Sequence, residues 1–426
     1  MGVDAWERLN EYNVTSLAYY YKHHVSGDDG AGEYFGAYGE RTDDMLANHE
    51  ALTRFWSSAA AEAEAEAEAG SSSSSSNVVL LGMHGMDLAD DDKLLATLQQ
   101  MHRMDYSAAE YLRMEIREII ESLPDGYANP LLTANAMAIQ SLDPIDNISE
   151  RDSIIIGDGI FEFLDFLDLG DGGGGGVSYI HSHEFGHHLQ YDLDVDEIGG
   201  VGSIPTNVAV VTRWWEMMAD TFGSYFNAHA LGGDMDDATL LDVHRAAFSM
   251  GDCESSIGTH HGLPRQRECA SGYGADLALI SHYDGGVVMP PSRLRDLFNE
   301  KYERLVRLDA EQCTAVVDES TLDADVYGEV SYDSSDSTSY LDGFTFGIHE
   351  TDQTSAFGMS ELDRPPPILQ DENGTVITKE EKGFWGENTW IISEPASYAA
   401  AAAAVGRLGM GLTFVASALA YYVLLC

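Results

Sequence analysis

The segment 177–193 constrains the chain most, because it carries the sequence HEFGH at residues 183–187. Residues four apart lie on one face of an α-helix, so His183 and His187 can offer two imidazole nitrogens to one tetrahedral metal ion. Glu184 then lies beside the remaining coordination position, where a carboxylate can act as a base. This pattern is typical of zinc-binding helices in hydrolases, although it also occurs by chance in ordinary helices.

A catalytic zinc site takes three protein ligands and leaves the fourth position for water, so a third ligand is needed. One solution places a His six residues after the second His, following a Gly. It is excluded here because Gln190 and Leu193 occupy those two positions. The other common solution is a Glu from a later helix. The sequence of residues 212–231 predicts such a helix, and Glu216 is its best candidate ligand.

Asp220 follows Glu216 by four residues, so both carboxylates lie on one helix face. We expect Asp220 to accept the second ring N–H of His183 or His187, as carboxylates near zinc sites commonly do. The alternative is a solvated acidic pair on an amphipathic helix. Large apolar residues surround the pair, and carboxylates in such surroundings need a partner. These residues are Trp214, Trp215, Met217, Met218 and Phe222.

The HEFGHH sequence, followed by a helix with Glu216 and Asp220, resembles the zincin metallopeptidases whose third ligand is Glu, the gluzincins. More narrowly it resembles the small neutral zinc metallopeptidases of that group. Residues 258–267, GTHHGLPRQR, are similar to the segment that follows their ligand helix. The resemblance spans residues 153–279 and implies an α+β, zincin-like fold, mainly helical with a small sheet.

The resemblance also implies roles for individual residues, with Zn²⁺ as the cofactor and a peptide or protein as the substrate. Glu184 would be the general base, and His261 would lie near the substrate or the oxyanion. Arg267 would brace the acidic residues beside the metal. Gly262 stands where many relatives have Pro, and His260 next to His261 leaves open which imidazole takes that role.

A sheet edge strand just upstream of the zinc helix pairs with extended substrates in zincins, so residues 153–159 are expected to form it. Helices are expected at 275–283 and 291–308.

Composition and patterning divide the chain into four regions. These are a mostly helical region 1–150 with a low-complexity insertion at 59–76, a region 151–312 that the resemblance implies is a zinc metallopeptidase core, an acidic accessory or partly disordered region 313–394, and a C-terminal region 395–426 expected to be a hydrophobic anchor or anchor signal.

The net charge of −50, from 22 basic and 72 acidic residues, argues against binding to nucleic acids or anionic lipids. Such a surface suits a soluble protein in a salty or extracellular setting. Two other classes stay open. The chain could be a degenerate zincin without catalysis, or an acidic, membrane-anchored cation-binding or adhesion protein in which HEFGH is coincidental.

The uncharged run at residues 408–426 is about as long as a helix that crosses a hydrocarbon core. We expect attachment to the cell surface through a glycolipid-anchor signal, or alternatively a retained tail anchor facing the cytosol, or a buried C-terminal helix. Glycosylation tripeptides begin at Asn13, Asn147 and Asn373.

Of the four cysteines, Cys253 and Cys269 bracket the GTHHG segment. They could form a disulfide in an oxidising compartment, or they could be free buried thiols.

Overall fold

The computed structural model describes residues 8–9, 11–27, 30–66, 78–140, 152–170, 174–193, 208–252, 261–283 and 286–307. All of them belong to one compact unit. The predicted C-terminal regions 313–394 and 395–426 lie outside these residues, as do Asn147 and Asn373. In the part of the chain described, no helix has the length and apolar character needed to cross a bilayer.

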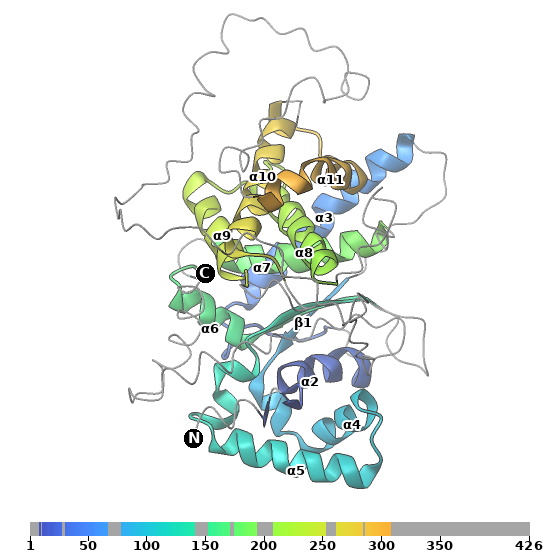
Figure 1. Ribbon diagram of the computed structural model, residues 1–426, viewed down its shortest axis with the longest axis vertical. Coiled ribbons are helices and arrows are strands. Elements are labelled where there is room, and N and C mark those ends of the chain that lie inside the picture. Colours follow the sequence, from blue (N-terminus) through green and yellow to red (C-terminus); the bar gives the residue numbers. More distant parts are fainter. Residues whose placement is uncertain are drawn as a thin grey trace, which may run out of the picture. The chain divides into compact units, whose positions relative to one another are not determined.

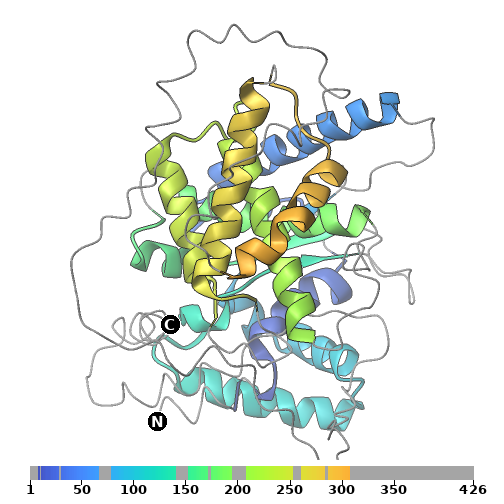
Figure 2. The same ribbon diagram turned by 45° about the horizontal axis from the view of Figure 1, so that its top comes forward.

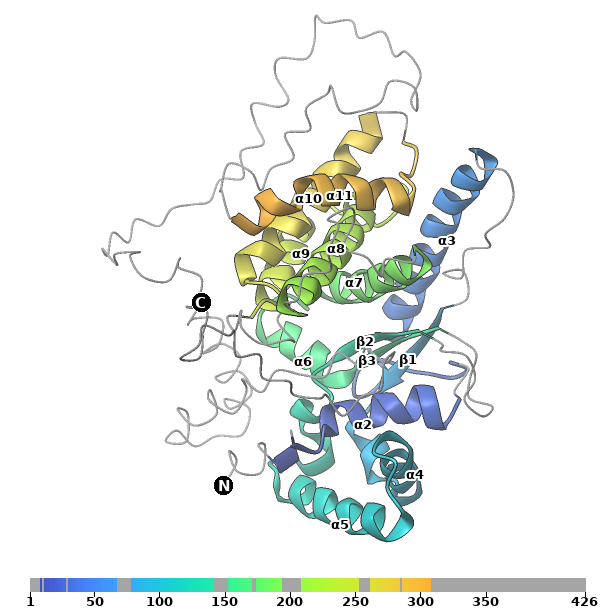
Figure 3. The same cartoon turned by 45° about the vertical axis from the view of Figure 1, so that its right-hand side comes forward.

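A three-stranded sheet lies at the centre of this unit, with the strands in the order β1-β3-β2. Strand β1 (Val79–Met83) runs parallel to β3 (Ser153–Gly157), and β2 (Ala136–Ile139) runs antiparallel to β3. Helices cover both faces of the sheet, so the described unit has three layers (Figures 1 and 3). The mostly helical structure with one small sheet confirms the predicted α+β class.

The side chains of β3 alternate between two cores, because successive residues of a strand point to opposite faces. Ile154 and Ile156 pack into the core that contains the metal-binding helix, whereas Ile155 packs into the other core. The helices of the first layer are α3 (Thr42–Glu66), α6 (Asp158–Phe166), α7 (Gly175–Asp192), α8 (Val208–Ala228), α9 (Asp237–Ser249), α10 (Pro264–Tyr283) and α11 (Pro291–Arg307). Those of the second layer are α2 (Val14–Tyr20), α4 (Asp91–Met101) and α5 (Tyr106–Ser122).

The prediction that residues 153–159 form the sheet edge is wrong, because β3 is the central strand. The reason lies in its sequence, since all five of its residues are buried and three consecutive isoleucines serve both faces. A strand buried on both sides is typically this uniformly apolar. The edge next to α7 is instead β2, a short strand that was not predicted from the sequence.

Helices α7 and α8 pack closely because glycines face the contact. A Cβ on Gly186 would lie 3.0 Å from the main-chain oxygen of Ala219, and a Cβ on Gly223 would lie 2.9 Å from Oγ of Ser182. Helix α10 packs in turn against α8 and α9, and the α9–α10 contact is visible as the yellow-green and yellow helices of Figure 2. This packing brings α7, α8 and α10 to one place.

Several helix boundaries differ from the predicted ones. Helix α8 begins at Val208, before the predicted 212, and α10 begins at Pro264, eleven residues before the predicted 275. Proline suits the first position of a helix because its missing N–H would have no partner there. Helix α3 extends to Glu66 and therefore includes the first part of the predicted low-complexity insertion. Residues 67–76 lie outside the described residues.

Candidate metal centre

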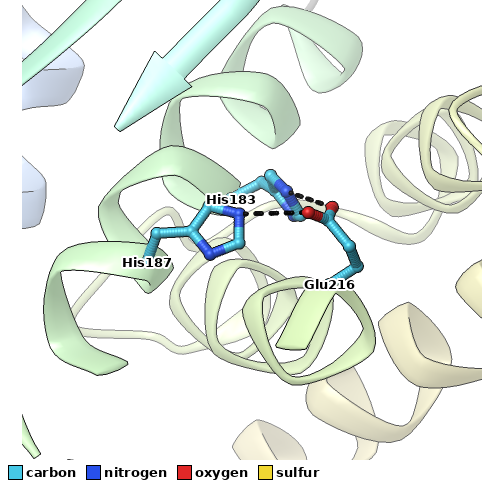
Figure 4. Close-up of side chains that lie close together, drawn as sticks. All are labelled: His183, His187 and Glu216. Atoms are coloured by element: carbon cyan, nitrogen blue, oxygen red, sulfur yellow. Dashed lines mark ion pairs between the residues drawn. The ribbon is translucent and has the colours of Figure 1, made fainter. Parts of the chain in front are cut away.

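Three buried side chains converge where α7 meets α8. The Nε2 of His183 lies 3.3 Å from Oε2 of Glu216, and the Nε2 of His187 lies 3.7 Å from Oε1 of the same carboxylate. Figure 4 shows the Glu216 carboxylate facing both imidazoles, with one ion pair drawn to each. Among the described residues, these three form the one group of His, Cys, Asp or Glu side chains whose ligand atoms all lie within 4.8 Å of one another.

The two distances from the Glu216 carboxylate to the imidazoles fit a tetrahedral metal ion. Zinc binds imidazole nitrogen and carboxylate oxygen at about 2.0–2.1 Å, so two ligand atoms at a tetrahedral angle are separated by about 3.3 Å. The separations of 3.3 Å and 3.7 Å between Glu216 and the two histidines are close to that value. A divalent cation could therefore be held with little movement of the three side chains.

Both imidazoles are fixed by a hydrogen bond at their other nitrogen. The Nδ1 of His183 lies 3.0 Å from Oδ1 of Asp220, which is the contact expected from the sequence. The Nδ1 of His187 lies 2.8 Å from Oε1 of Gln190, and Nε2 of Gln190 donates to the main-chain oxygen of Trp215. With a proton on each Nδ1, each Nε2 lone pair points toward Glu216 and is available to a metal.

Arg267 joins the two carboxylates of α8. Its Nε lies 2.5 Å from Oδ2 of Asp220, and its Nη1 lies 3.2 Å from Oε2 of Glu216. Tyr179 completes the network, because its hydroxyl donates to Asp220 over 2.5 Å and accepts from Nη2 of Arg267 over 3.0 Å. Buried carboxylates need such compensation. Arg267 thus contacts both acidic residues that it was predicted to brace.

Burial and the charged neighbours shift the pKa values of the ligand set. Burial lowers the pKa of His183, but hydrogen bonds to Asp220 and Glu216 outweigh burial and raise that pKa to about 9. Burial lowers the pKa of His187 to about 4. Burial would raise the pKa of Glu216, yet the charge of His261 and the hydrogen bond with His183 keep it well below its usual range. Without metal, a protonated His183 therefore pairs with an ionised Glu216.

Glu184 lies on the same helix, one residue after His183, and is 8% exposed. Burial raises the pKa of its carboxyl group to about 7, and the charges around it include His183, which lowers this pKa, and Glu216, which raises it. The main-chain N–H of Ala138 on β2 donates a hydrogen bond to this carboxylate. A carboxyl group with a pKa near 7 can both accept and return a proton at neutral pH.

His261 is more exposed than the three candidate ligands, with 20% of its side chain exposed against 5–7% for theirs, and its charge lowers the pKa of Glu216. Its main-chain N–H donates to Oδ2 of Asp252 over 2.7 Å, and its Nδ1 lies 3.4 Å from the same oxygen. Gly262 follows with a φ of +108°, a value that favours glycine. His260 lies outside the described residues, so the structure places one of the two predicted histidines.

Sequence reasoning missed four residues that the structure brings to the site. Tyr179 and Gln190 each had a usable signal, because they lie four residues before His183 and three residues after His187, on neighbouring positions of the helix surface. Asp252 and Ala138 had none, since their contacts depend on how distant segments pack. Cys269 on α10 is disulfide-bonded, and its partner lies outside the described residues.

Comparison of the chain with protein-family models, with curated proteins and with solved structures gave no match. The structure by itself defines an α+β protein with a buried cluster of two histidines and one glutamate that could hold a metal ion.

Proposed function

We propose that the protein is a zinc-dependent metallopeptidase with a zincin-like core. The observation that carries the proposal is the convergence of His183, His187 and Glu216 from two helices, with Glu184 beside them. Two neutral imidazoles and one carboxylate are a donor set that zinc commonly has in catalytic sites. The expected Zn²⁺ would be held by Nε2 of each histidine and by the Glu216 carboxylate.

Zinc bound there would supply a Lewis acid that makes a water molecule acidic near neutral pH. Glu184 would take the proton of that water as it attacks a peptide carbonyl carbon. The same carboxyl group then gives the proton to the amine nitrogen when the C–N bond breaks. Its raised pKa, due to burial, suits both steps.

Other residues of the site would orient the metal ligands and stabilise buried charge. Asp220 and Gln190 hold the histidine rings, and Arg267 compensates the charge of the buried carboxylates. His261, kept in place by Asp252, is the candidate to donate a hydrogen bond to the oxyanion, because it is more exposed than the ligands and its charge acts on Glu216.

An extended peptide is the substrate class that the surroundings favour. Strand β2 packs against α7 and has no further strand paired to its outer edge among the described residues. Such an edge can add a peptide as a further strand. The net charge of −50 disfavours strongly acidic peptides. Attachment to a membrane through residues 408–426 remains part of the proposal and lies outside the described residues.

The decisive test is the Glu184→Gln variant of the zinc-loaded protein, assayed on casein. We expect it to keep its zinc and to lose about 10²–10⁴-fold in turnover, because only the base is removed. Glu110→Gln, a change on the far helix α5, is the matched control and should keep full activity. Full activity of Glu184→Gln would refute the proposed mechanism.

Two results would favour the alternative functions. A wild-type protein that binds one zinc tightly but cleaves no peptide would be a degenerate zincin with a structural metal. A protein that binds no zinc but many weakly held calcium ions would be an acidic cation-binding or adhesion protein.

A further inference from the structure

The outer edge of β2 is defined by its pairing with β3. The N–H of Gly157 donates to the main-chain oxygen of Asn135 over 3.0 Å. In an antiparallel pair, hydrogen-bonded and non-hydrogen-bonded residue pairs alternate. Ala138, which lies opposite Ile154, is therefore in a non-hydrogen-bonded pair. Its N–H and C=O point away from β3, toward the free edge.

Helix α7 occupies both of these main-chain groups. The C=O of Ala138 accepts from the hydroxyl of Tyr191 over 3.3 Å. The main chain of Ala138 also interacts with the Glu184 carboxylate, whose pKa this interaction lowers. Glu184 and Tyr191 lie two helical turns apart on one face of α7. The next outward N–H, that of Ala136, donates to the side chain of Asn135 over 2.9 Å. Side chains thus take the positions that a pairing strand would take.

We propose that Tyr191 is a positioning residue that competes with substrate for Ala138, so that an extended peptide frees Glu184 when it pairs with β2. The inference rests on the proposed peptidase function. A peptide C=O replaces Glu184 as the acceptor of the Ala138 N–H, and a peptide N–H replaces the phenol as the donor to the Ala138 C=O. Glu184 then turns to the attacking water. A small amide that cannot reach β2 does not displace Glu184 from Ala138, so it is a poor substrate.

The surroundings of Tyr191 support this role. Burial raises the pKa of its phenol, and the nearby charge of Glu184 adds to the rise, so the hydroxyl stays a donor. The ring lies 5.9 Å from Trp215 and 5.5 Å from His188, which limits where the freed side chain can move. A plain structural role is the alternative, because proteins often cover sheet edges to prevent aggregation. The two roles predict different kinetics.

Tyr191→Phe removes the competing hydroxyl and keeps the ring. For an uncharged, apolar octapeptide we expect KM to fall about 2–10-fold, as for the loss of one competing hydrogen bond, with kcat changed less than about twofold. Hydrolysis of a single-residue amide should not improve. Tyr273→Phe is the matched control, because the Tyr273 hydroxyl also donates to a main-chain oxygen, that of Leu297, away from β2. An unchanged KM in Tyr191→Phe, or an equal change for both substrates, would overturn the inference.

A second measurement uses the unaltered protein and does not need catalysis. The same octapeptide, N-methylated at one amide at a time, is titrated into metal-free protein by calorimetry. One N-methyl position should weaken binding about 2–10-fold, because that peptide N–H no longer reaches Ala138, and the others should have smaller effects. Uniform effects along the peptide would refute pairing at β2. If the zinc-loaded protein cleaves no peptide, the proposed function fails, while this titration still decides whether β2 pairs with a peptide.

Discussion

The Nδ1 of His183 lies 3.0 Å from Oδ1 of Asp220, a residue on a different helix and 37 positions away in the sequence. This contact fixes the ring so that Nε2 points at Glu216. Asp220 is fully buried yet ionised. Burial favours its neutral form, but Arg267 and His183 hold its pKa below its usual value.

Asp220→Asn should weaken zinc binding about 10–100-fold, because an amide orients the imidazole less firmly and makes it a weaker ligand. Competition with a chromogenic chelator measures the affinity. Asp236→Asn is the matched control, since Asp236 caps the exposed start of α9 and Asn caps equally well. Equal zinc affinity in the Asp220 variant and the wild type would show that this contact does not prepare the site.

Zinc binding should release protons, and the number should depend on pH. The pKa of His183 without metal is about 9, so this imidazole is protonated at pH 7 but must be neutral to bind zinc. Titration calorimetry in buffers of different ionisation enthalpy should show about one proton released from His183 at pH 7, together with part of a proton from Glu184. The proton from His183 should no longer be released above its pKa, which leaves only the proton lost by the zinc-bound water. Below that pKa, the apparent affinity should rise about tenfold per pH unit as the pH is raised. Proton release that does not change with pH would contradict the ion pair between His183 and Glu216.

Much of the ligand set follows from local sequence. The four-residue spacing of His183 and His187, and of Glu216 and Asp220, places each pair on one helix face whatever the rest of the chain does. The apolar residues around Glu216 also indicate that its carboxylate needs a partner. These local relationships hold in the structure, where Glu216 reaches both imidazoles.

The surroundings of the ligands follow from packing and could not be read from local patterns. Strand β2, with the sequence AMAI, is too short and too weakly patterned to be distinguished from a loop. The three isoleucines of β3 indicate a strand but do not say whether it is central or at an edge. The close approach of α7 to α8 depends on Gly186 and Gly223, whose partners lie far away in the sequence.

Gly223→Ala should destabilise the protein by about 1–3 kcal/mol, because the added methyl group would lie 2.9 Å from Oγ of Ser182 and 3.0 Å from the main-chain nitrogen of His183. The separation of α7 from α8 should also weaken zinc binding. Urea unfolding of the metal-free protein measures the first effect, and chelator competition measures the second. A variant with wild-type stability and zinc affinity would show that the close contact at Gly223 determines neither property.

Salt should stabilise the protein. With 72 acidic and 22 basic residues, the folded chain repels itself, and raising KCl from about 0.1 M to about 1 M shortens the screening length from about 10 Å to about 3 Å. We expect the melting temperature to rise by several degrees, measured by circular dichroism. A melting temperature that falls over this range would mean that ion pairs such as Lys22–Glu33 outweigh the repulsion.

The zinc content of the purified protein after dialysis tests the central claim most directly. The wild type should retain one zinc per chain, and Glu216→Gln, with its fold checked by circular dichroism, should retain almost none. Glu300→Gln, an exposed change on α11, should retain one. A wild-type protein without zinc, or a folded Glu216 variant that retains as much zinc as the wild type, would contradict a metal centre built from His183, His187 and Glu216.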